Sequence, residues 1–345
     1  MIKPSLYGLD LAETEGLMET LEAPRYRAKQ ILDWIYQRHM LAWEEANNLP
    51  KDLKDRFAGT HRASSLEFVE AQDSGAGESI KYLFRTWDGR MLESVLILQQ
   101  DRRTVCVSTQ LGCKIGCVFC ASGKGKFGRN LTAGEIVEQV AQIEKKSGKI
   151  TNVVFMGMGE PLDNFEATMK SLEILQAPWG FAMGSRRITV STSGITPRIL
   201  EFVKRNEGRV RLSVSLHAGG ENKRTELVPI NKKYPLRDLI KTLHQVHEVL
   251  KRSITFEYTL IDGVNDSEKD AQAVAGIAAP LDATVNVIPY NPIREMNFKT
   301  PTPENIERFR RVLENRKVRV TVRQTAGRDI HAACGQLRLD REEGI

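Results

Sequence analysis

Residues 104–123 read TVCVSTQLGCKIGCVFCASG, and this stretch decides how the rest of the chain is interpreted. It starts as a short apolar strand and continues into a loop in which Cys113, Cys117 and Cys120 follow the spacing C-x3-C-x2-C. Four of the five cysteines of the chain lie between positions 106 and 120. Buried bystander cysteines seldom cluster in this way. The stretch therefore predicts metal or redox chemistry just after a strand.

From about residue 103 onward, short apolar strands alternate with amphipathic helices. This alternation predicts a parallel sheet with helices outside it, and six such units fit a partial (β/α)6 barrel open on one side. Folds of this kind place their chemistry at the carboxyl ends of the strands. The predicted strands are 104–109, 152–156, 187–192, 211–216, 254–260 and 284–290, with 318–323 as an edge strand, and the predicted helices include 132–146, 163–176, 235–250 and 302–316.

The residues before this barrel predict two smaller units. Helical spacing over 10–22 and 25–38, and a short helix after Pro50, indicate a small helical domain over residues 1–60. Strand patterns at 66–72, 79–86 and 91–98, separated by Ser-Gly and Asp-Gly turns, indicate an antiparallel β connector over 61–98. The barrel then covers 99–328, and a C-terminal segment covers 329–345 and ends in a tail.

The composition is that of a globular protein with about two domains. Of the 345 residues, 41% are hydrophobic and 27% charged, which argues against a disordered or fibrous chain. No run approaches the roughly 18 apolar residues of a membrane span, and the N-terminus does not read as a secretory signal, so we expect a cytoplasmic protein. An odd number of cysteines argues against a structural disulfide framework.

The net charge of +6 is unevenly distributed along the chain. Residues 1–90 contain 12 Lys and Arg against 15 Asp and Glu, a net charge of −3, whereas residues 91–345 contain 38 against 29, a net charge of +9. A basic excess is compatible with a nucleic-acid partner. The arithmetic places that excess in the larger C-terminal part.

Three thiolates this close in sequence can hold one soft metal centre. An electron-transfer iron–sulfur cluster uses four cysteines, so three leave one iron open to a ligand that is not protein. The alternative is a structural zinc completed by a histidine or a fourth cysteine. Only one C-x2-C is present, and the next histidine is as far away as His217.

Polar residues lie at the ends of four strands of the predicted barrel. Gly159 and Glu160, in the segment MGMGEP, follow the second strand. A plain glycine turn with a helix-capping glutamate, and structural serines, would explain them one at a time. Four such sites at four strand ends are more typical of one ligand pocket. The other members of the set are Ser191, Ser215, Leu216, His217 and Asn291.

The combined motifs resemble the RlmN/Cfr family of radical S-adenosylmethionine (SAM) RNA methyltransferases, and most closely its RlmN branch. The resemblance covers nearly the whole chain, including PRYRAKQILDWIY in the N-terminal helical region. The segment 323–327, RQTAG, lacks the second arginine and the pre-glycine arginine that are frequent in that branch. The motifs are CVSTQLGCKIGCVFCASG, RNLTAGEI, MGMGEP, STSG, SLHA, PINKKYP, YNP and DIHAACGQL.

This resemblance implies a radical SAM barrel, cofactors and a substrate. Cys113, Cys117 and Cys120 would bind one 4Fe-4S cluster, and the strand-end residues from Gly159 to Asn291 would bind SAM, with two molecules used per turnover. The RlmN branch methylates carbon 2 of one adenine in the peptidyl-transferase region of 23S rRNA and of the adenosine next to the anticodon in some tRNAs. The Cfr branch methylates carbon 8 of the same rRNA adenine.

The resemblance also implies roles for three further residues. Cys334 would receive a methyl group from one SAM, and a deoxyadenosyl radical from the second would take a hydrogen from that methyl group. The carbon radical would add to the adenine, Glu93 would take the ring proton, and Cys106 would release the product by forming a disulfide with Cys334. Taken alone, Cys106 reads as a small buried residue, Cys334 as a tail thiol and Glu93 as a solvated strand residue.

The expected partners are 23S rRNA, tRNA and a flavodoxin- or ferredoxin-type electron donor, with the chain as a monomer. Candidate RNA contacts are Lys124, Lys126 and Arg129 around Phe127, although a solvated loop is an equal interpretation, and the basic face of Arg25, Arg27 and Lys29. Two other classes remain open. One is a radical SAM maturase or isomerase acting on a peptide or small molecule, and the other is a zinc-stabilised RNA-binding protein.

Overall fold

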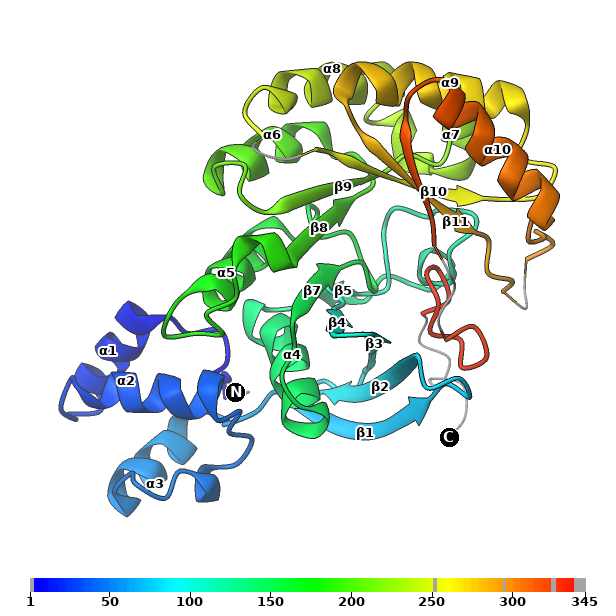
Figure 1. Cartoon of the computed structure of the whole chain (residues 1–345). Coiled ribbons are helices and arrows are strands. Elements are labelled where there is room, and N and C mark those ends of the chain that lie inside the picture. The colour runs from blue at the N-terminus through cyan, green and yellow to red at the C-terminus, as the bar shows by residue number, and fades with distance from the viewer. Residues whose placement is uncertain (1–2, 251–252, 294–295, 324–326, 338–345) are drawn as a thin grey trace.

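A single ten-stranded sheet organises the chain (Figure 1). The computed structural model describes residues 3–250, 253–293, 296–323 and 327–337. Within these residues the strand order is β1-β2-β3-β4-β7-β8-β9-β10-β11-β12. The bounds are β1 Leu66–Asp73, β2 Ser79–Thr86, β3 Met91–Gln99, β4 Arg102–Cys106, β7 Asn152–Phe155, β8 Ile188–Thr192, β9 Arg211–Ser215, β10 Thr255–Leu260, β11 Thr284–Pro289 and β12 Arg319–Val322.

The strands from β4 to β12 run parallel, and helices cover their outer side (Figure 1). The predicted α/β barrel architecture is therefore confirmed, with β12 as the expected edge strand. Apolar side chains between this sheet and its helices form the main core. The helices are α4 Ala133–Ser147, α5 Phe165–Gln176, α6 Thr196–Arg205, α7 Glu221–Leu227, α8 Leu236–His247, α9 Glu268–Ala278 and α10 Pro303–Asn315.

The antiparallel strands β1, β2 and β3 extend the barrel sheet. β3 pairs antiparallel with β4, and Val95 lies opposite Cys106. Because side chains alternate across a strand, Glu93, Val95 and Ile97 share one face of β3. Val95 and Ile97 line a cavity inside the barrel together with Cys106, so the antiparallel strands contribute one wall of the barrel interior.

A short two-stranded ribbon closes the loop that contains the cysteine triplet. β5 (Gln110–Leu111) pairs with β6 (Arg129–Asn130), so that residues 112–128 form a loop between them. Gly112 has φ +78, and a Cβ there would lie 2.7 Å from the carbonyl oxygen of Lys126. A side chain at this position would therefore force the two sides of the loop apart.

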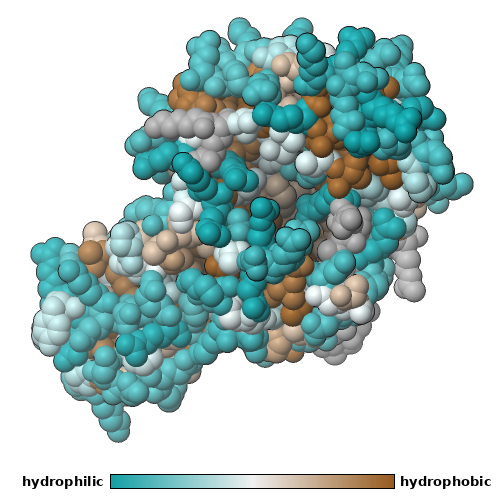
Figure 2. All heavy atoms as spheres, viewed as in Figure 1, coloured by the Kyte–Doolittle hydropathy of each residue, from teal (hydrophilic) through white to brown (hydrophobic). Residues whose placement is uncertain are grey.

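The N-terminal helices pack beside α4 and α5, away from the open side of the barrel (Figure 1). They are α1 (Leu11–Thr20), α2 (Arg27–Leu32), which continues into a π-helical turn over Asp33–Gln37, and α3 (Lys51–Thr60). Tyr36 packs against Trp179 and Phe181 at centroid distances of 5.8 Å. Hydrophilic side chains dominate the face of these helices that Figure 2 shows.

The C-terminal segment returns to the open side of the barrel. Asp329 accepts a hydrogen bond from the Gly75 amide at 2.7 Å, and the Gly335 carbonyl accepts one from the Ala121 amide at 2.7 Å. Ser122, beside the cysteine triplet, donates to the Leu337 carbonyl at 2.6 Å. These bonds hold residues 329–337 against the triplet loop, whereas residues 338–345 of the predicted tail lie outside the described residues. Within the described residues, no helix is long and apolar enough to cross a membrane.

Candidate active site

Two adjoining cavities open at the carboxyl ends of the barrel strands. The larger has a volume of about 910 Å³ and the smaller about 740 Å³, each including space at its mouth. Cys120, Arg323 and Cys334 line both of them. Nine residues that the sequence singled out line the larger cavity together: Cys113, Cys117, Cys120, Gly159, Glu160, Ser191, Ser215, His217 and Cys334.

The cysteine triplet fits an iron–sulfur cluster better than a single zinc ion. Among the described residues, no three His, Cys, Asp or Glu side chains converge as ligands of one metal ion do. Thiolates around one tetrahedral zinc lie about 3.8 Å apart, given Zn–S bonds of about 2.3 Å, whereas the thiolates of a cluster bind different irons. Burial, and then the neighbouring thiols, raise the pKa of Cys117. A soft, positively charged centre among these thiols would therefore favour their thiolate forms.

Apolar side chains surround the triplet. Ile115 and Phe119, which alternate with the cysteines, pack with Leu227, Val228 and Tyr290. This small apolar cluster is separate from the main core. It fixes the loop and limits the access of water to the thiols.

Gly157 and Gly159 allow two stretches of backbone to cross at close range. A Cβ on Gly159 would lie 2.5 Å from Cβ of Gln110, and one on Gly157 would lie 2.6 Å from Oγ of Ser108. Gly159 also has φ +98. Both glycines therefore permit the approach of the chain that leads into the triplet loop.

Glu160 is buried and turned toward the end of β8. Its carboxylate accepts hydrogen bonds from the amide and hydroxyl of Ser193, at 2.7 and 2.8 Å, and from the amide of Leu162 at 3.0 Å. Burial raises the pKa of Glu160, and the bonds from Ser193 oppose that rise. A ligand ammonium group in the cavity would favour its ionised form.

Ser191, Ser215 and His217 lie on the adjacent wall. The two serine hydroxyls are 3.5 Å apart. His217 has φ +57, and its Nδ1 accepts a hydrogen bond from the Thr259 amide at 3.0 Å. Burial, with a smaller contribution from Arg224, lowers the pKa of His217 to about 3, so the ring is neutral and its proton is on Nε2. Leu216 is fully buried and does not line this cavity.

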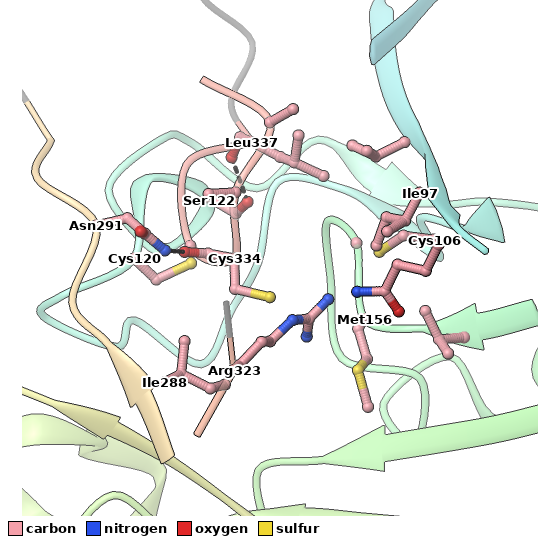
Figure 3. A pocket seen from close by; sticks show the side chains of 17 residues that line it. Ile97, Cys106, Cys120, Ser122, Met156, Ile288, Asn291, Arg323, Cys334 and Leu337 are labelled. Atoms are coloured by element: carbon pink, nitrogen blue, oxygen red, sulfur yellow. Dashed lines mark hydrogen bonds between the residues drawn. The ribbon is translucent and has the colours of Figure 1, made fainter. Parts of the chain in front are cut away.

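The smaller cavity brings the two outlying cysteines together. Cys106, Cys334 and Arg323 all line it, and Figure 3 shows the Arg323 side chain pointing into the space between the two sulfur atoms. Electrostatic attraction to the ionised form of Cys334, whose side chain is also a hydrogen-bond partner, raises the pKa of Arg323. Burial raises the pKa of Cys106 to about 12, so Cys106 is a neutral thiol at neutral pH.

Asn291 and Glu93 are not among the residues that line the larger cavity. Asn291 lines the smaller cavity, where its amide nitrogen donates to the Cys334 carbonyl at 3.2 Å (Figure 3). Glu93 is buried on β3, its carboxylate 3.3 Å from Nζ of Lys81, and it is not among the described residues that line either cavity. It shares the inward face of β3 with Val95.

The candidate RNA-contact residues are surface residues on two separate elements. Lys124 and Lys126 are exposed, and Lys114 lies 4.2 Å above the Phe127 ring. Arg129 is bound by the carboxylates of Asp88 and Glu135, so its charge is neutralised locally. In the N-terminal helices, Arg25 pairs with Glu15, and Arg27 lies 5.0 Å from the Tyr26 ring centre.

Sequence reasoning missed three polar residues of the site. Ser193 binds Glu160, Arg323 lies beside Cys334, and Lys81 pairs with Glu93. Ser193 was accessible in principle, because it belongs to the motif STSG that follows a strand. The contact of Lys81 depends on the register of the neighbouring strands β2 and β3, and that of Arg323 on the approach of the C-terminal segment. Residues 324–326 of the RQTAG segment lie outside the described residues.

The chain matches two family models. Residues 107–273 match the radical SAM superfamily, and residues 5–62 match the ribosomal RNA large subunit methyltransferase N-terminal domain. The first match contains the triplet and most of the barrel strands. The second covers the N-terminal helices.

Curated relatives and a solved structure match over nearly the full length. "Probable dual-specificity RNA methyltransferase RlmN 2" of Protochlamydia amoebophila is 44% identical over 338 residues, covering 96% of this chain and 94% of that protein. An RlmN of Geobacillus kaustophilus is 42% identical, covering 99% and 94%. A crystal structure of a radical SAM methyltransferase from Sphaerobacter thermophilus superimposes with a TM-score of 0.93 at 44% identity, covering 97% of this chain and 99% of that one. With this agreement added to the geometry of the site, the chain belongs to the RlmN/Cfr family of radical SAM RNA methyltransferases and is most similar to RlmN.

Proposed function

We propose that this enzyme methylates carbon 2 of adenine in 23S rRNA and in tRNA, through a methyl group carried by Cys334. The observation that carries the proposal is the position of Cys334, which lines both cavities and so adjoins the triplet on one side and Cys106 on the other. A carrier thiol must meet a methyl donor, a hydrogen-abstracting group and a resolving thiol. Cys334 lies where all three can reach it.

The larger cavity is the proposed cofactor site. Cys113, Cys117 and Cys120 would hold the 4Fe-4S cluster. SAM would lie against Gly159, Glu160, Ser191, Ser215 and His217, and Leu216 would support that wall from the core. Bound there, two SAM molecules per turnover supply one methyl group and one hydrogen-abstracting radical. Asn291 orients the Cys334 backbone through its hydrogen bond and closes the site toward the smaller cavity.

The chain's own residues then perform three tasks. Cys334 attaches its one-carbon group to carbon 2 of the adenine, and the unpaired electron left on the adduct would return to the cluster that the triplet would hold. Glu93 takes the displaced ring proton, and its carboxylate lies 3.3 Å from Nζ of Lys81. The Cys106 thiolate attacks the Cys334 sulfur, so that a disulfide forms, the carbon–sulfur bond breaks and the carbon takes a proton to become a methyl group.

Substrate binding requires the adenine to leave its stacked position, at a cost of a few kcal/mol. Contacts to phosphates supply much of the binding free energy of such complexes. We assign these contacts to Lys124 and Lys126 beside the triplet loop, and to the N-terminal helical domain over residues 1–60. The enzyme would act as a cytoplasmic monomer that receives electrons from a flavodoxin or ferredoxin.

The experiment is single-substrate methylation followed by nucleoside analysis. Protein reconstituted under anaerobic conditions is incubated with SAM, a reductant and either 23S rRNA or tRNA from a strain that lacks the methylation. Digestion and mass spectrometry against standards should yield 2-methyladenosine from both RNAs, and Cys334→Ala should yield none. Recovery of 8-methyladenosine would reassign the enzyme to the other branch of the family, and methylation by Cys334→Ala would remove the carrier from the mechanism.

A further inference from the structure

Arg224 is a fully buried arginine on α7, beneath the larger cavity. Its exposed fraction is 0%. The guanidinium donates to the carbonyl oxygens of Ser193, Ser215 and Leu216 at 2.6, 3.3 and 3.2 Å, and to the side-chain oxygen of Asn231 at 2.6 Å. It therefore ties the ends of β8 and β9, which carry the proposed SAM-binding residues, to α7.

All of these acceptors are neutral. Within the described parts of the chain, no carboxylate forms an ion pair with Arg224. Burial lowers the pKa of Arg224 only to about 10, so the guanidinium keeps its charge at neutral pH. A buried charge without a counter-charge costs several kcal/mol. The fold therefore retains a buried positive charge at this point without a direct ion pair, and hydrogen bonds to carbonyl oxygens and the electrostatic attraction of Glu221 offset only part of that cost.

The helix that carries Arg224 packs directly against the triplet loop. The Leu227 carbonyl, at the last residue of α7, accepts a hydrogen bond from the Val118 amide at 3.1 Å, so the helix that carries Arg224 is joined to the loop directly after Cys117. Leu227 also packs against Ile115 and Phe119 of that loop. Arg224 interacts electrostatically with Cys117.

We propose that Arg224 is the buried counter-charge of the cluster held by Cys113, Cys117 and Cys120, and that it makes the cluster easier to reduce. A 4Fe-4S core with charge +2 and three thiolates has a net charge of −1, and one added electron makes it −2. A fixed positive charge stabilises the second state more than the first, and in a dry site the effect is large. Arg224 is therefore a positioning residue that also tunes the reduction potential of the cluster.

The inference rests on the cluster assignment and not on which RNA carbon is methylated. The central experiment is a reductive titration of reconstituted protein without RNA, followed by electron paramagnetic resonance, for wild type, Arg224→Gln and Arg224→Lys. At the potential that half-reduces the wild type, the ratio of reduced to oxidised cluster should fall at least tenfold in Arg224→Gln, which equals 59 mV for one electron. Arg224→Lys, which keeps the charge, should stay close to wild type.

The matched control is Arg205→Gln, which removes an equal charge from an exposed ion pair with Glu166 and should leave the titration unchanged. Iron and sulfide content show whether each variant holds a complete cluster. If Arg224→Gln does not fold, Glu221→Gln provides the second test, because its carboxylate interacts electrostatically with Arg224 and accepts hydrogen bonds that a glutamine oxygen can also accept. Loss of the Glu221 charge should raise the ratio of reduced to oxidised cluster. The change should be smaller than that in Arg224→Gln, because Glu221 is exposed.

A fully loaded Arg224→Gln with a wild-type titration would overturn the proposal, as would Arg224→Lys shifting as far as Arg224→Gln. The first result would leave Arg224 with only a structural role. The second would mean that hydrogen-bond geometry and not charge sets the effect. Failure of every variant, wild type included, to bind iron and sulfide would instead refute the cluster assignment beneath the proposed function.

Discussion

At the scale of single residues, the proposed reaction uses two cysteines with different surroundings, Cys334 as the methyl carrier and Cys106 as the thiol that releases the product. Cys334 lies at the junction of the cavities with Arg323 beside it, whereas Cys106 is buried at the end of β4 with a pKa of about 12. A thiol with that pKa is a poor nucleophile at neutral pH. Cys106 is therefore expected to react only after a proton acceptor enters the smaller cavity or Arg323 turns toward it.

Cys106→Ala should separate the attachment of carbon to RNA from its release. Cys334 should still accept a methyl group and attach to the adenine, because neither step uses Cys106. Release should fail, since no second thiolate can attack the Cys334 sulfur. A covalent protein–RNA species, sensitive to ribonuclease, should accumulate on denaturing gels.

The control is the double variant Cys106→Ala, Cys334→Ala, which has no carrier and should form no such species. Normal turnover of Cys106→Ala without an adduct would mean that Cys106 is a core residue and that the product leaves by another route.

The pKa of His217 predicts a loss of stability in mild acid. Its folded-state pKa, about 3, lies below the unfolded value of about 6.5. Below pH 6.5 the unfolded chain binds a proton that the folded chain excludes, so His217 should cost about 2 kcal/mol of unfolding free energy between pH 7 and pH 5. Asparagine tolerates the φ of +57, and its oxygen can accept from the Thr259 amide. Urea unfolding of metal-free His217→Asn should therefore lose about 2 kcal/mol less than wild type over this range, and equal losses would contradict the assigned pKa.

Sequence spacing identified those site residues whose positions follow from the neighbouring sequence. The triplet and five of the strand-end residues line one cavity because they lie at or beyond the carboxyl ends of parallel strands; the five are Gly159, Glu160, Ser191, Ser215 and His217. Arg224 and Lys81 were not predicted, because an arginine or lysine is exposed by default and only tertiary packing buries it. Asn291 was assigned to SAM, yet its hydrogen bond goes to Cys334, a contact that no local pattern encodes.

At the scale of elements, the strands and helices follow the predicted pattern, and their ends differ where tertiary contacts intervene. The strand predicted over 104–109 ends at Cys106, because the Ser108 amide donates to the Gln139 side chain of α4 at 2.8 Å. The helix predicted over 25–38 begins at Arg27 and widens into a π-helical turn at Asp33–Gln37, which turns three consecutive side chains, Trp34 to Tyr36, into the core. Hydrophobic periodicity assumes a constant number of residues per turn. It therefore cannot predict the early end of the strand or the π-helical turn.

The segment after β7, with Gly159, passes close to the segment after β4, with Gln110, and a substitution at Gly159 tests this contact. Gly159→Ala must adopt φ +98 and place a Cβ 2.5 Å from that of Gln110, so one of the two loops has to move. We expect a loss of about 2 kcal/mol or more in stability and a clear loss of SAM binding. Thermal unfolding and isothermal titration would measure both.

Gly184→Ala is the matched control, because a Cβ on Gly184 would meet no atom within 4 Å and the backbone there already has φ −62. It should be neutral or slightly stabilising. Wild-type SAM affinity in Gly159→Ala would contradict the view that this crossing shapes the larger cavity.

At the scale of the whole molecule, the N-terminal helices are held against the barrel by close backbone contacts. Gly134 on α4 approaches Tyr7 so closely that a Cβ would lie 2.1 Å from the Tyr7 carbonyl oxygen. Lys170 of α5 pairs with Asp10 and Glu13. These contacts fix the position of the N-terminal helices relative to α4 and α5.

Gly134→Ala should loosen that attachment. Alanine favours a helix over glycine by about 1 kcal/mol, but the overlap with Tyr7 outweighs this gain because the Tyr7 oxygen is a backbone atom that cannot turn aside. Limited proteolysis should cut the N-terminal region faster, RNA affinity should fall, and SAM cleavage without RNA should persist. Gly276→Ala on α9, where a Cβ meets no atom within 4 Å, should gain about 1 kcal/mol and resist proteolysis like wild type. Unchanged RNA affinity in Gly134→Ala would contradict a role of the docked N-terminal helices in RNA binding.

The central claim is that the methyl group passes through Cys334, and isotope labelling tests it most directly. Protein is first charged with SAM whose methyl group is fully deuterated, and peptide mass spectrometry should find that group on Cys334. A single turnover with unlabelled SAM and RNA should then yield a methyladenosine with two deuterium atoms, because one is abstracted and one hydrogen enters from water on release. A product that retains all three deuterium atoms, or active enzyme with an unmodified Cys334, would contradict the account.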